Sequence, residues 1–131
     1  MAELRKVLLV DDDEDIRMIG QMALHDVGGF EVVTASSGAR ALELAAAERP
    51  DVILLDVMMP GMDGPTTFRR LRDDEATAAI PVVFVTAKVQ RQEVQRYLDL
   101  GAIGVIGKPF DPMSLPDELR AIVARASAGE R

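Results

Sequence analysis

Five short apolar segments recur along the chain and constrain its fold more than any other feature. Each segment is rich in β-branched residues and stops at a polar residue, a glycine or a proline. Runs of this kind are typical of strands that are buried on both faces of a sheet. The segments are Val7–Val10, Val32–Val33, Val52–Leu55, Val82–Val85 and Ile103–Ile106.

The stretches between these strands carry apolar residues at helical spacing. The first predicted helix places Ile16, Ile19, Ala23 and Val27 on one face and ends near Gly28-Gly29. The apolar faces of the next helices are Ala41, Leu42 and Ala45, then Phe68 and Leu71, then Val94, Tyr97 and Leu98, then Leu115, Leu119, Ile122 and Val123. The predicted boundary signals are Pro50, Pro65 in a first turn, Gly101 as a stop, and Asp111, Pro112 or Ser114 as a start.

Five alternations of strand and helix predict an α/β fold, in which a parallel sheet is covered by helices on both faces. The 131 residues provide enough chain for one ordinary domain. Ligands of such sheets bind outside the carboxyl ends of the strands. The residues directly after each strand are therefore the candidates for function.

Composition excludes several other classes of protein. The chain has no cysteine, which removes disulfides, thiolate metal sites and cysteine nucleophiles. A net charge of −7 opposes direct binding to nucleic acid or to an anionic membrane surface. No apolar run reaches the roughly 18 residues that a membrane span needs, and the N-terminal apolar run is too short for a signal peptide. We therefore expect a soluble protein of the cytoplasm.

Aspartates follow two of the predicted strands. Asp11 and Asp12 come after the first strand and Asp56 after the third, and these strands are neighbours in the expected fold. Carboxylates about 4 Å apart repel by roughly 4 kcal/mol at an effective dielectric constant of about 20. A cation would relieve this repulsion, and oxygen ligands favour Mg²⁺, with Mn²⁺ as an alternative. Asp13 or Glu14 is expected to cap the helix that follows.

Hydrogen-bond donors follow the last two strands. Thr86 and Ala87 come after the fourth strand and Lys108 after the fifth. A hydroxyl, a backbone N–H and an ammonium group around a carboxylate and a metal ion suit a further anion. A phosphoryl group fits this arrangement, because the cations neutralise it and the other donors bind its oxygens.

With these residues the sequence resembles the receiver domains of two-component response regulators. The matching segments are Leu8–Asp12, Asp51–Gly64, Val85–Ala87 and Gly107–Phe110, and the resemblance covers about residues 5–125. It implies a flavodoxin-like, doubly wound (βα)5 fold with strand order 2-1-3-4-5. It also implies a receiver domain at 1–126 and a C-terminal tail at 127–131. Only one helix fits after Phe110, so we expect no output domain in this chain.

The resemblance assigns a role to each acidic residue of the site. Asp56 would be the phosphoacceptor. Asp12 and Asp56 would bind Mg²⁺ directly, Asp11 would act largely through water, and the backbone carbonyl of Met58 would complete the protein ligands. The receiver itself would catalyse the transfer of the phosphoryl group and, slowly, its hydrolysis, but would perform no other enzymatic reaction.

The resemblance also implies how the remaining groups respond. Thr86 would move toward the phosphoryl group, Lys108 would pair with it, and the backbone of Met58 and Ala87 would contact it. The Lys108–Pro109 peptide bond would be cis. The donor would be a sensor histidine kinase or a histidine phosphotransfer protein. The output would be a changed surface for a downstream protein, a phosphoryl relay, or a homodimer through the fourth and fifth helices.

The sequence departs from the family at Val105. Receivers commonly carry an aromatic switch residue at this position of the fifth strand, and that ring turns inward when the threonine moves. Val105 has no ring to rotate, so the route from Thr86 to the surface around the last two helices is open to question. Tyr97 on the fourth helix is a candidate substitute, and simple packing is the alternative role of this residue.

Met58 and Lys88 lie two residues beyond Asp56 and Thr86, where the family places side chains that flank the path of water to the phosphoryl group. We expect Met58 to shield the phosphoryl group, so that the phosphorylated form lasts at least minutes. Replacement of Met58 by asparagine would then speed dephosphorylation.

Three other functions fit parts of the pattern. An aspartyl-phosphate phosphatase of the haloacid-dehalogenase type would place its nucleophile after the first strand in an Asp-x-Asp pattern ending in Thr, which the run from Asp11 to Asp15 lacks. A flavodoxin-like redox module would need a phosphate loop where this chain has carboxylates. A receiver used only as a phosphorylation-independent binding module remains open because of Val105.

Overall fold

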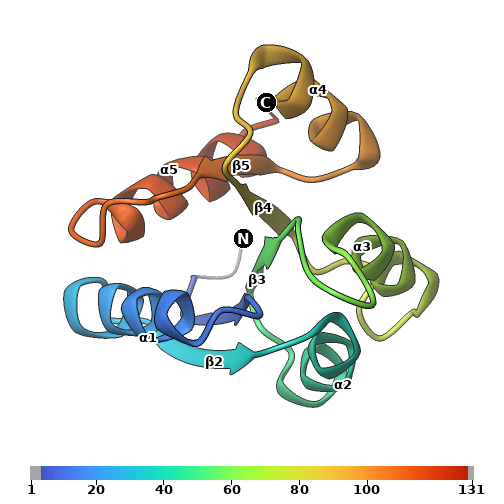
Figure 1. The fold of residues 1–131 in the computed structure, drawn as a ribbon, viewed down its shortest axis with the longest axis horizontal. Helices are drawn as coiled ribbons and strands as arrows, with labels where there is room; N and C mark the ends of the chain where they lie inside the picture. The colour runs from blue at the N-terminus through green and yellow to red at the C-terminus, as the bar shows by residue number, and fades with distance from the viewer. Residues whose placement is uncertain (1–3, 130–131) are drawn as a thin grey trace.

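A computed structural model describes residues 4–129, which form a five-stranded sheet with helices on both sides (Figure 1). The strands are β1 Lys6–Val10, β2 Glu31–Ala35, β3 Val52–Asp56, β4 Val82–Thr86 and β5 Gly104–Gly107. The helices are α1 Glu14–Met22, which continues into the π-helical segment Ala23–Val27, α2 Gly38–Glu48, α3 Gly64–Asp73, α4 Arg91–Leu100 and α5 Leu115–Ser127.

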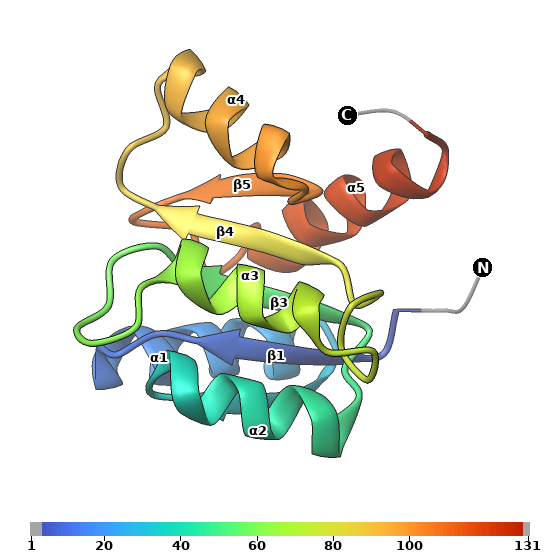
Figure 2. The ribbon, with the colours of Figure 1, turned by 90° about the vertical axis from the view of Figure 1, so that its right-hand side faces the viewer.

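All neighbouring strands are parallel, in the order β2-β1-β3-β4-β5. The predicted fold class and strand order are therefore confirmed. The carboxyl ends of the strands point toward one edge of the sheet, as the arrowheads in Figure 2 show. The loops that follow the strands consequently meet at this edge, where the sequence places its candidate residues.

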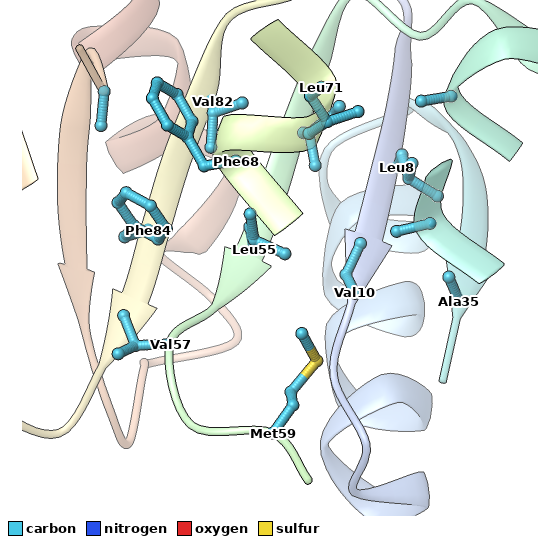
Figure 3. Close-up of a cluster of buried hydrophobic side chains, with 14 of the residues drawn as sticks. Leu8, Val10, Ala35, Leu55, Val57, Met59, Phe68, Leu71, Val82 and Phe84 are labelled. Carbon is cyan, nitrogen blue, oxygen red and sulfur yellow. The ribbon is translucent and has the colours of Figure 1, made fainter. Parts of the chain in front are cut away.

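Two apolar layers hold the helices on the sheet. On one face, Leu8, Leu55 and Phe84 of the strands pack with Phe68 and Leu71 of α3 (Figure 3), together with residues of α2 and α4. On the other face, α1 and α5 cover the alternate strand residues. The three central strands are buried on both faces, and this fixes the positions of their carboxyl ends.

The expectation that all five strands are buried on both faces is wrong for the edges of the sheet. In β2, Glu31 is exposed and Val32 only half-buried, and in β5 buried and half-buried residues alternate. An edge strand has a neighbour on one side only, so its helices cover less of it. β5 also begins at Gly104, and Ile103 lies just before it.

The predicted apolar face of the first helix is wrong in part. Ile19 and Val27 are exposed, whereas Gly20, Ala23 and Leu24 are buried. A Cβ atom added to Gly20 would lie 2.6 Å from a methyl carbon of Leu9, so the helix lies against β1 through its small residues. The close approach of the backbone, together with the wider π-helical turn, sets which face is buried.

The predicted boundary signals agree with the structure at several helices. Asp13 caps α1 by accepting hydrogen bonds from the backbone N–H groups of Asp15 and Ile16. Pro65 lies in the first turn of α3, Gly101 ends α4 and Ser114 precedes α5. The helix α5 runs to Ser127, the first residue of the predicted tail, and residues 130–131 lie outside the described part. Within residues 4–129, no helix has the length and apolar character that crossing a membrane requires.

Candidate functional site

Three aspartates meet at the carboxyl edge of the sheet. Asp11 follows β1, and Asp56 is the last residue of the neighbouring β3, one position later than the strand end predicted from the apolar run. Carboxylate oxygens of Asp11, Asp12 and Asp56 all lie within 4.8 Å of one another. Asp11 and Asp56 are 2% and 3% exposed, whereas Asp12 is exposed to solvent. The predicted acidic cluster is thus present and open to solvent on one side.

Lys108 reaches into this cluster from the loop after β5. Its Nζ atom lies 2.7 Å from Oδ2 of Asp11 and 3.0 Å from Oδ1 of Asp56. The backbone N–H of Lys108 also donates to the carbonyl of Thr86, 2.9 Å away, which ties its loop to the end of β4. The Lys108–Pro109 bond is cis, as the resemblance implies. One ammonium group therefore bridges two buried carboxylates.

The electrostatic balance of the site leaves its acids short of positive charge. Burial raises the pKa of Asp56, the hydrogen bond from Lys108 lowers it and the charge of Asp11 raises it, and the net result is a raised pKa. Burial lowers the pKa of Lys108, but the two carboxylates outweigh burial and its pKa is raised. Lys108 consequently remains charged. A second cation near Asp56 would favour the ionised form of the Asp56 carboxyl group.

The donor set fits a hard divalent cation. Three carboxylates supply oxygen ligands, and the exposure of Asp12 gives an ion access while leaving room for water ligands, which Mg²⁺ retains. The backbone N–H of Met58 donates a hydrogen bond to Asp56, which lowers the pKa of that carboxyl group. This contact places the backbone of Met58 beside the cluster, and the role of its carbonyl as a metal ligand stays a prediction.

Thr86 ends β4, next to the end of β3, and is 3% exposed. Its hydroxyl accepts a hydrogen bond of 3.1 Å from the backbone N–H of Lys88, in the loop that leads to α4. Ala87, between these two residues, is exposed. The predicted residues of the fourth strand thus lie at the correct edge of the sheet, and the hydroxyl of Thr86 is held toward the loop.

Three further predicted residues lie near the site and differ in exposure. The side chain of Met58 is 73% exposed. Val105 is half-buried and lies opposite Phe84 in the register of β4 and β5. Tyr97 is only 6% exposed and packs against Phe84, with 5.0 Å between the ring centroids.

Sequence reasoning missed two groups that shape the site. Arg17 of α1 donates from Nη1 to the carbonyl of Asp11, 2.8 Å away, and helps to hold the loop after β1. Gly64 is the first residue of α3, where an added Cβ would lie 2.4 Å from the carbonyl oxygen of Asp56. The signal for Gly64 was its place just before Pro65 at a helix start, which brings the helix against the end of β3.

Comparison with known proteins identifies the family. Residues 7–120 match the model of the response regulator receiver domain. The chain is 40% identical to the transcriptional regulatory protein CseB of Streptomyces coelicolor, over all of this chain and 56% of that protein. It is 42% identical to the response regulator PleD of Caulobacter vibrioides, over 89% of this chain and 26% of that protein. The chain spans about half the length of CseB and less of PleD.

Solved structures agree with this result. The chemotaxis protein CheY4 of Vibrio cholerae superimposes with a TM-score of 0.83 and 35% identity, covering 92% of this chain and 99% of that one. A putative response regulator from Chloroflexus aurantiacus gives a TM-score of 0.82 and 32% identity, covering 94% of this chain and all of that one. Both likenesses extend over nearly the whole fold described above.

Proposed function

The chain belongs to the response regulator receiver domain family of two-component systems, and on this basis we propose that it accepts a phosphoryl group on Asp56. The domain is proposed to comprise residues 1–126. The observation that carries the proposal is the contact of Lys108 with both Asp11 and Asp56 at the edge of three clustered carboxylates. The half-buried ammonium group of Lys108 is shared by two buried acids, and the third acid, Asp12, is exposed to solvent. This arrangement leaves room for a divalent ion and an anion together.

Each residue has a defined task in this proposal. A carboxylate oxygen of Asp56 would attack the phosphorus of a phosphohistidine, and the P–N bond would break with its electron pair on the imidazole nitrogen. That nitrogen would take a proton from solvent, so that the donor histidine leaves as neutral imidazole. Asp11, Asp12 and the Met58 carbonyl would hold Mg²⁺, or Mn²⁺ in its place, together with Asp56. The bound ion supplies positive charge for the oxygens of the transferring group.

Lys108 and Thr86 then bind the product. Lys108 already lies 3.0 Å from Asp56 and stays charged, so it can pair with the new phosphoryl oxygens. The hydroxyl of Thr86, which accepts a hydrogen bond from the N–H of Lys88, would move toward the phosphoryl group and donate a hydrogen bond to it. The backbone N–H of Ala87 and of Met58 would bind further oxygens. The added charge of about −1.5 to −2 supplies the driving force.

The partners follow from this chemistry. The donor is a sensor histidine kinase or a histidine phosphotransfer protein in the cytoplasm, and a downstream protein reads the phosphorylated surface. Exposed methionines of α1, Met18 at 62% and Met22 at 51%, offer apolar area on the helix that follows the acidic loop, where a donor can dock. A net charge of −7 disfavours direct contact with nucleic acid or an anionic membrane, and a homodimer through α4 and α5 is a second form of output.

The test uses acetyl phosphate as a small phosphodonor, with intact mass as the readout. We expect a single phosphoryl adduct on the wild type with Mg²⁺, no adduct with a chelator, and no adduct on Asp56→Ala. Asp51→Ala is the matched control, because Asp51 lies just before the other end of the same strand, and it should be phosphorylated as the wild type is. An adduct on Asp56→Ala would refute the assignment, and a wild type without adduct would favour a phosphorylation-independent binding module.

A further inference from the structure

Three aromatic rings form a row that leads from α3 across the sheet to α4. The rings of Phe68 and Phe84 lie 5.7 Å apart between centroids, and those of Phe84 and Tyr97 lie 5.0 Å apart. Both pairs are tilted, an arrangement that aromatic rings favour. Phe84 also faces Val105 across the β4–β5 ladder. The ring that packs on β4 at this position thus comes from α4, and the β5 residue beside it is a valine.

The same tyrosine shares a cavity with the residue that is proposed to respond to phosphorylation. A cavity of about 230 Å³ is lined by Thr86 and Tyr97, and also by Met58 and Lys88 at the mouth of the site. The hydroxyl of Thr86 accepts a hydrogen bond from the backbone N–H of Lys88, 3.1 Å away, in the loop that leads to α4. A movement of Thr86 toward Asp56 therefore changes both the cavity wall and the loop that begins α4.

The first turn of α4 has no side-chain cap. Its N-cap residue, Gln90, makes no side-chain capping hydrogen bond, as is also true of Ser114 at α5, whereas the N-cap residues of α1, α2 and α3 each accept one or more. Glu93, one turn into α4, lines the same cavity, and its buried Oε2 atom has no hydrogen-bond partner within residues 4–129. A buried acceptor without a partner costs free energy. A shift of α4 that gives the Oε2 atom of Glu93 a hydrogen-bond donor would therefore lower the free energy of the fold.

We infer that Tyr97 couples Thr86 to α4, in place of the ring that β5 lacks. This inference rests on the proposed phosphorylation of Asp56. When Thr86 turns toward the phosphoryl group, the ring of Tyr97 moves into the space that opens beside Thr86, and α4 shifts with it. The donors Lys88 and Arg96, which line the cavity, then come within reach of the carboxylate of Glu93. Packed elements of this kind switch between discrete arrangements, and phosphorylation shifts their populations.

The chain offers a direct probe, because Tyr97 is its only tyrosine and it has no tryptophan. Tyrosine emission is recorded while acetyl phosphate and Mg²⁺ are added, with the phosphorylated fraction measured by intact mass in the same samples. We expect the emission to change in proportion to the phosphorylated fraction. Thr86→Val keeps the shape of the side chain without its hydroxyl. In this variant the change in tyrosine emission, divided by the phosphorylated fraction, should disappear.

Each outcome decides a separate point. If the wild type gains the phosphoryl group and its emission stays constant, the inference about Tyr97 is wrong while the proposed function stands. An equal change in phosphorylated Thr86→Val would also overturn the inference, because the hydroxyl would then play no part. Failure of the wild type to gain the phosphoryl group would overturn the proposed function and the inference together.

A second measurement separates a coupling role from mere packing. Amide hydrogen exchange of α4, residues 91–100, is compared with and without phosphorylation in the wild type, Tyr97→Phe and Tyr97→Leu. Tyr97→Phe keeps the ring and should retain the wild-type change in exchange. Tyr97→Leu should be phosphorylated but should lose that change. A full wild-type response in Tyr97→Leu would show that the ring does not carry the coupling, and the emission experiment decides the matter if Tyr97→Leu folds poorly.

Discussion

Two aspartates flank the same strand and have different surroundings. Asp51 precedes β3 at the amino edge of the sheet and accepts hydrogen bonds from the backbone N–H groups of Arg5 and Lys6, at 2.9 and 2.8 Å. Asp56 ends β3 at the carboxyl edge, where burial beside Asp11 raises its pKa and Lys108 is its charged partner. The backbone thus satisfies one carboxylate, while the other lies in a cluster that holds too little positive charge.

The difference shows how a parallel sheet separates stability from chemistry. At the amino edge, the carboxylate of Asp51 ties the start of β3 to the start of β1. At the carboxyl edge, loops bring three acids together at a cost that a metal ion can offset. Lysines follow the same division, because Lys6 pairs with exposed Glu31 and with Glu48, whereas Lys108 pairs with two buried acids. The following changes test this contrast.

Removal of a lysine charge should lower the free energy of unfolding much more at the carboxyl edge of the sheet than at the amino edge. Lys108→Met leaves Asp11 and Asp56 buried without their cation, and should lower the free energy of unfolding by about 3 kcal/mol without Mg²⁺. Saturating Mg²⁺ should recover part of this loss. Lys6→Met is the control, since the two lysine side chains are similarly exposed, at 23% and 20%, and it should cost far less than Lys108→Met with or without Mg²⁺. Urea denaturation measures both, and a Mg²⁺-independent loss in Lys108→Met would contradict the account.

Asp51→Ala removes the carboxylate that accepts hydrogen bonds from the start of β1. The N–H groups of Arg5 and Lys6 then lose this acceptor, and we expect a loss of about 2 kcal/mol in the free energy of unfolding. Asp51→Asn retains one acceptor oxygen and should lose less. Equal losses in the two variants, measured by urea denaturation, would show that charge and not backbone hydrogen bonding is the role of Asp51.

The shielding of Asp56 from water is tested at Met58. The side chain of Met58 lies at the mouth of the site, and an asparagine there could hold a water molecule near the phosphoryl group. Met58→Asn should therefore shorten the life of the phosphorylated form by roughly tenfold, equal to about 1.4 kcal/mol in the barrier. Met113→Asn changes a methionine of similar exposure, 69% against 73%, and should leave the rate unchanged. Equal lifetimes for the wild type and Met58→Asn by mass spectrometry would end the shielding hypothesis.

Asp63 gives the smallest expected effect and shows what a solvent-exposed aspartate contributes. It caps α3, and the backbone N–H of Thr66, 2.9 Å away, lowers its pKa below the usual 3.8. Asp63→Ala should cost about 1 kcal/mol at neutral pH. A lowered carboxyl pKa stabilises the fold above the unfolded-state pKa, and this stability disappears as pH falls through the folded-state value. The difference between wild type and Asp63→Ala should hence shrink in acid, and a constant difference between pH 7 and about pH 2 would contradict the assignment.

The sequence was sufficient for the central strands and for the acids, because both depend on local patterns. Apolar runs indicate buried strands, and the carboxyl-edge rule brings together the residues that follow them, such as Asp11, Asp56 and Lys108. The half-exposed edge strand β2 and the buried face of α1 were not predictable in this way. They depend on which elements have neighbours and on how closely Gly20 allows α1 to approach Leu9.

Details of the site that depend on side-chain direction were equally out of reach. The sequence places Thr86 at a strand end but does not show that its hydroxyl accepts from Lys88. The helical spacing of Tyr97 suggests packing, whereas its contact with Phe84 and its shared cavity with Thr86 follow from the crossing of α4 over β4. The sequence names Tyr97 as a candidate for coupling, and the tertiary geometry supplies the contacts through which it could act.

The most direct test of the central claim is chemical mapping of the phosphorylated residue. Borohydride reduces an acyl phosphate to the alcohol, which converts a phosphorylated aspartate to homoserine and releases phosphate. After treatment with acetyl phosphate and Mg²⁺, tandem mass spectrometry should find homoserine at position 56 and aspartate at positions 11, 12 and 51. Homoserine at any of those other positions, or none in a protein that has gained the mass of a phosphoryl group, would contradict the account.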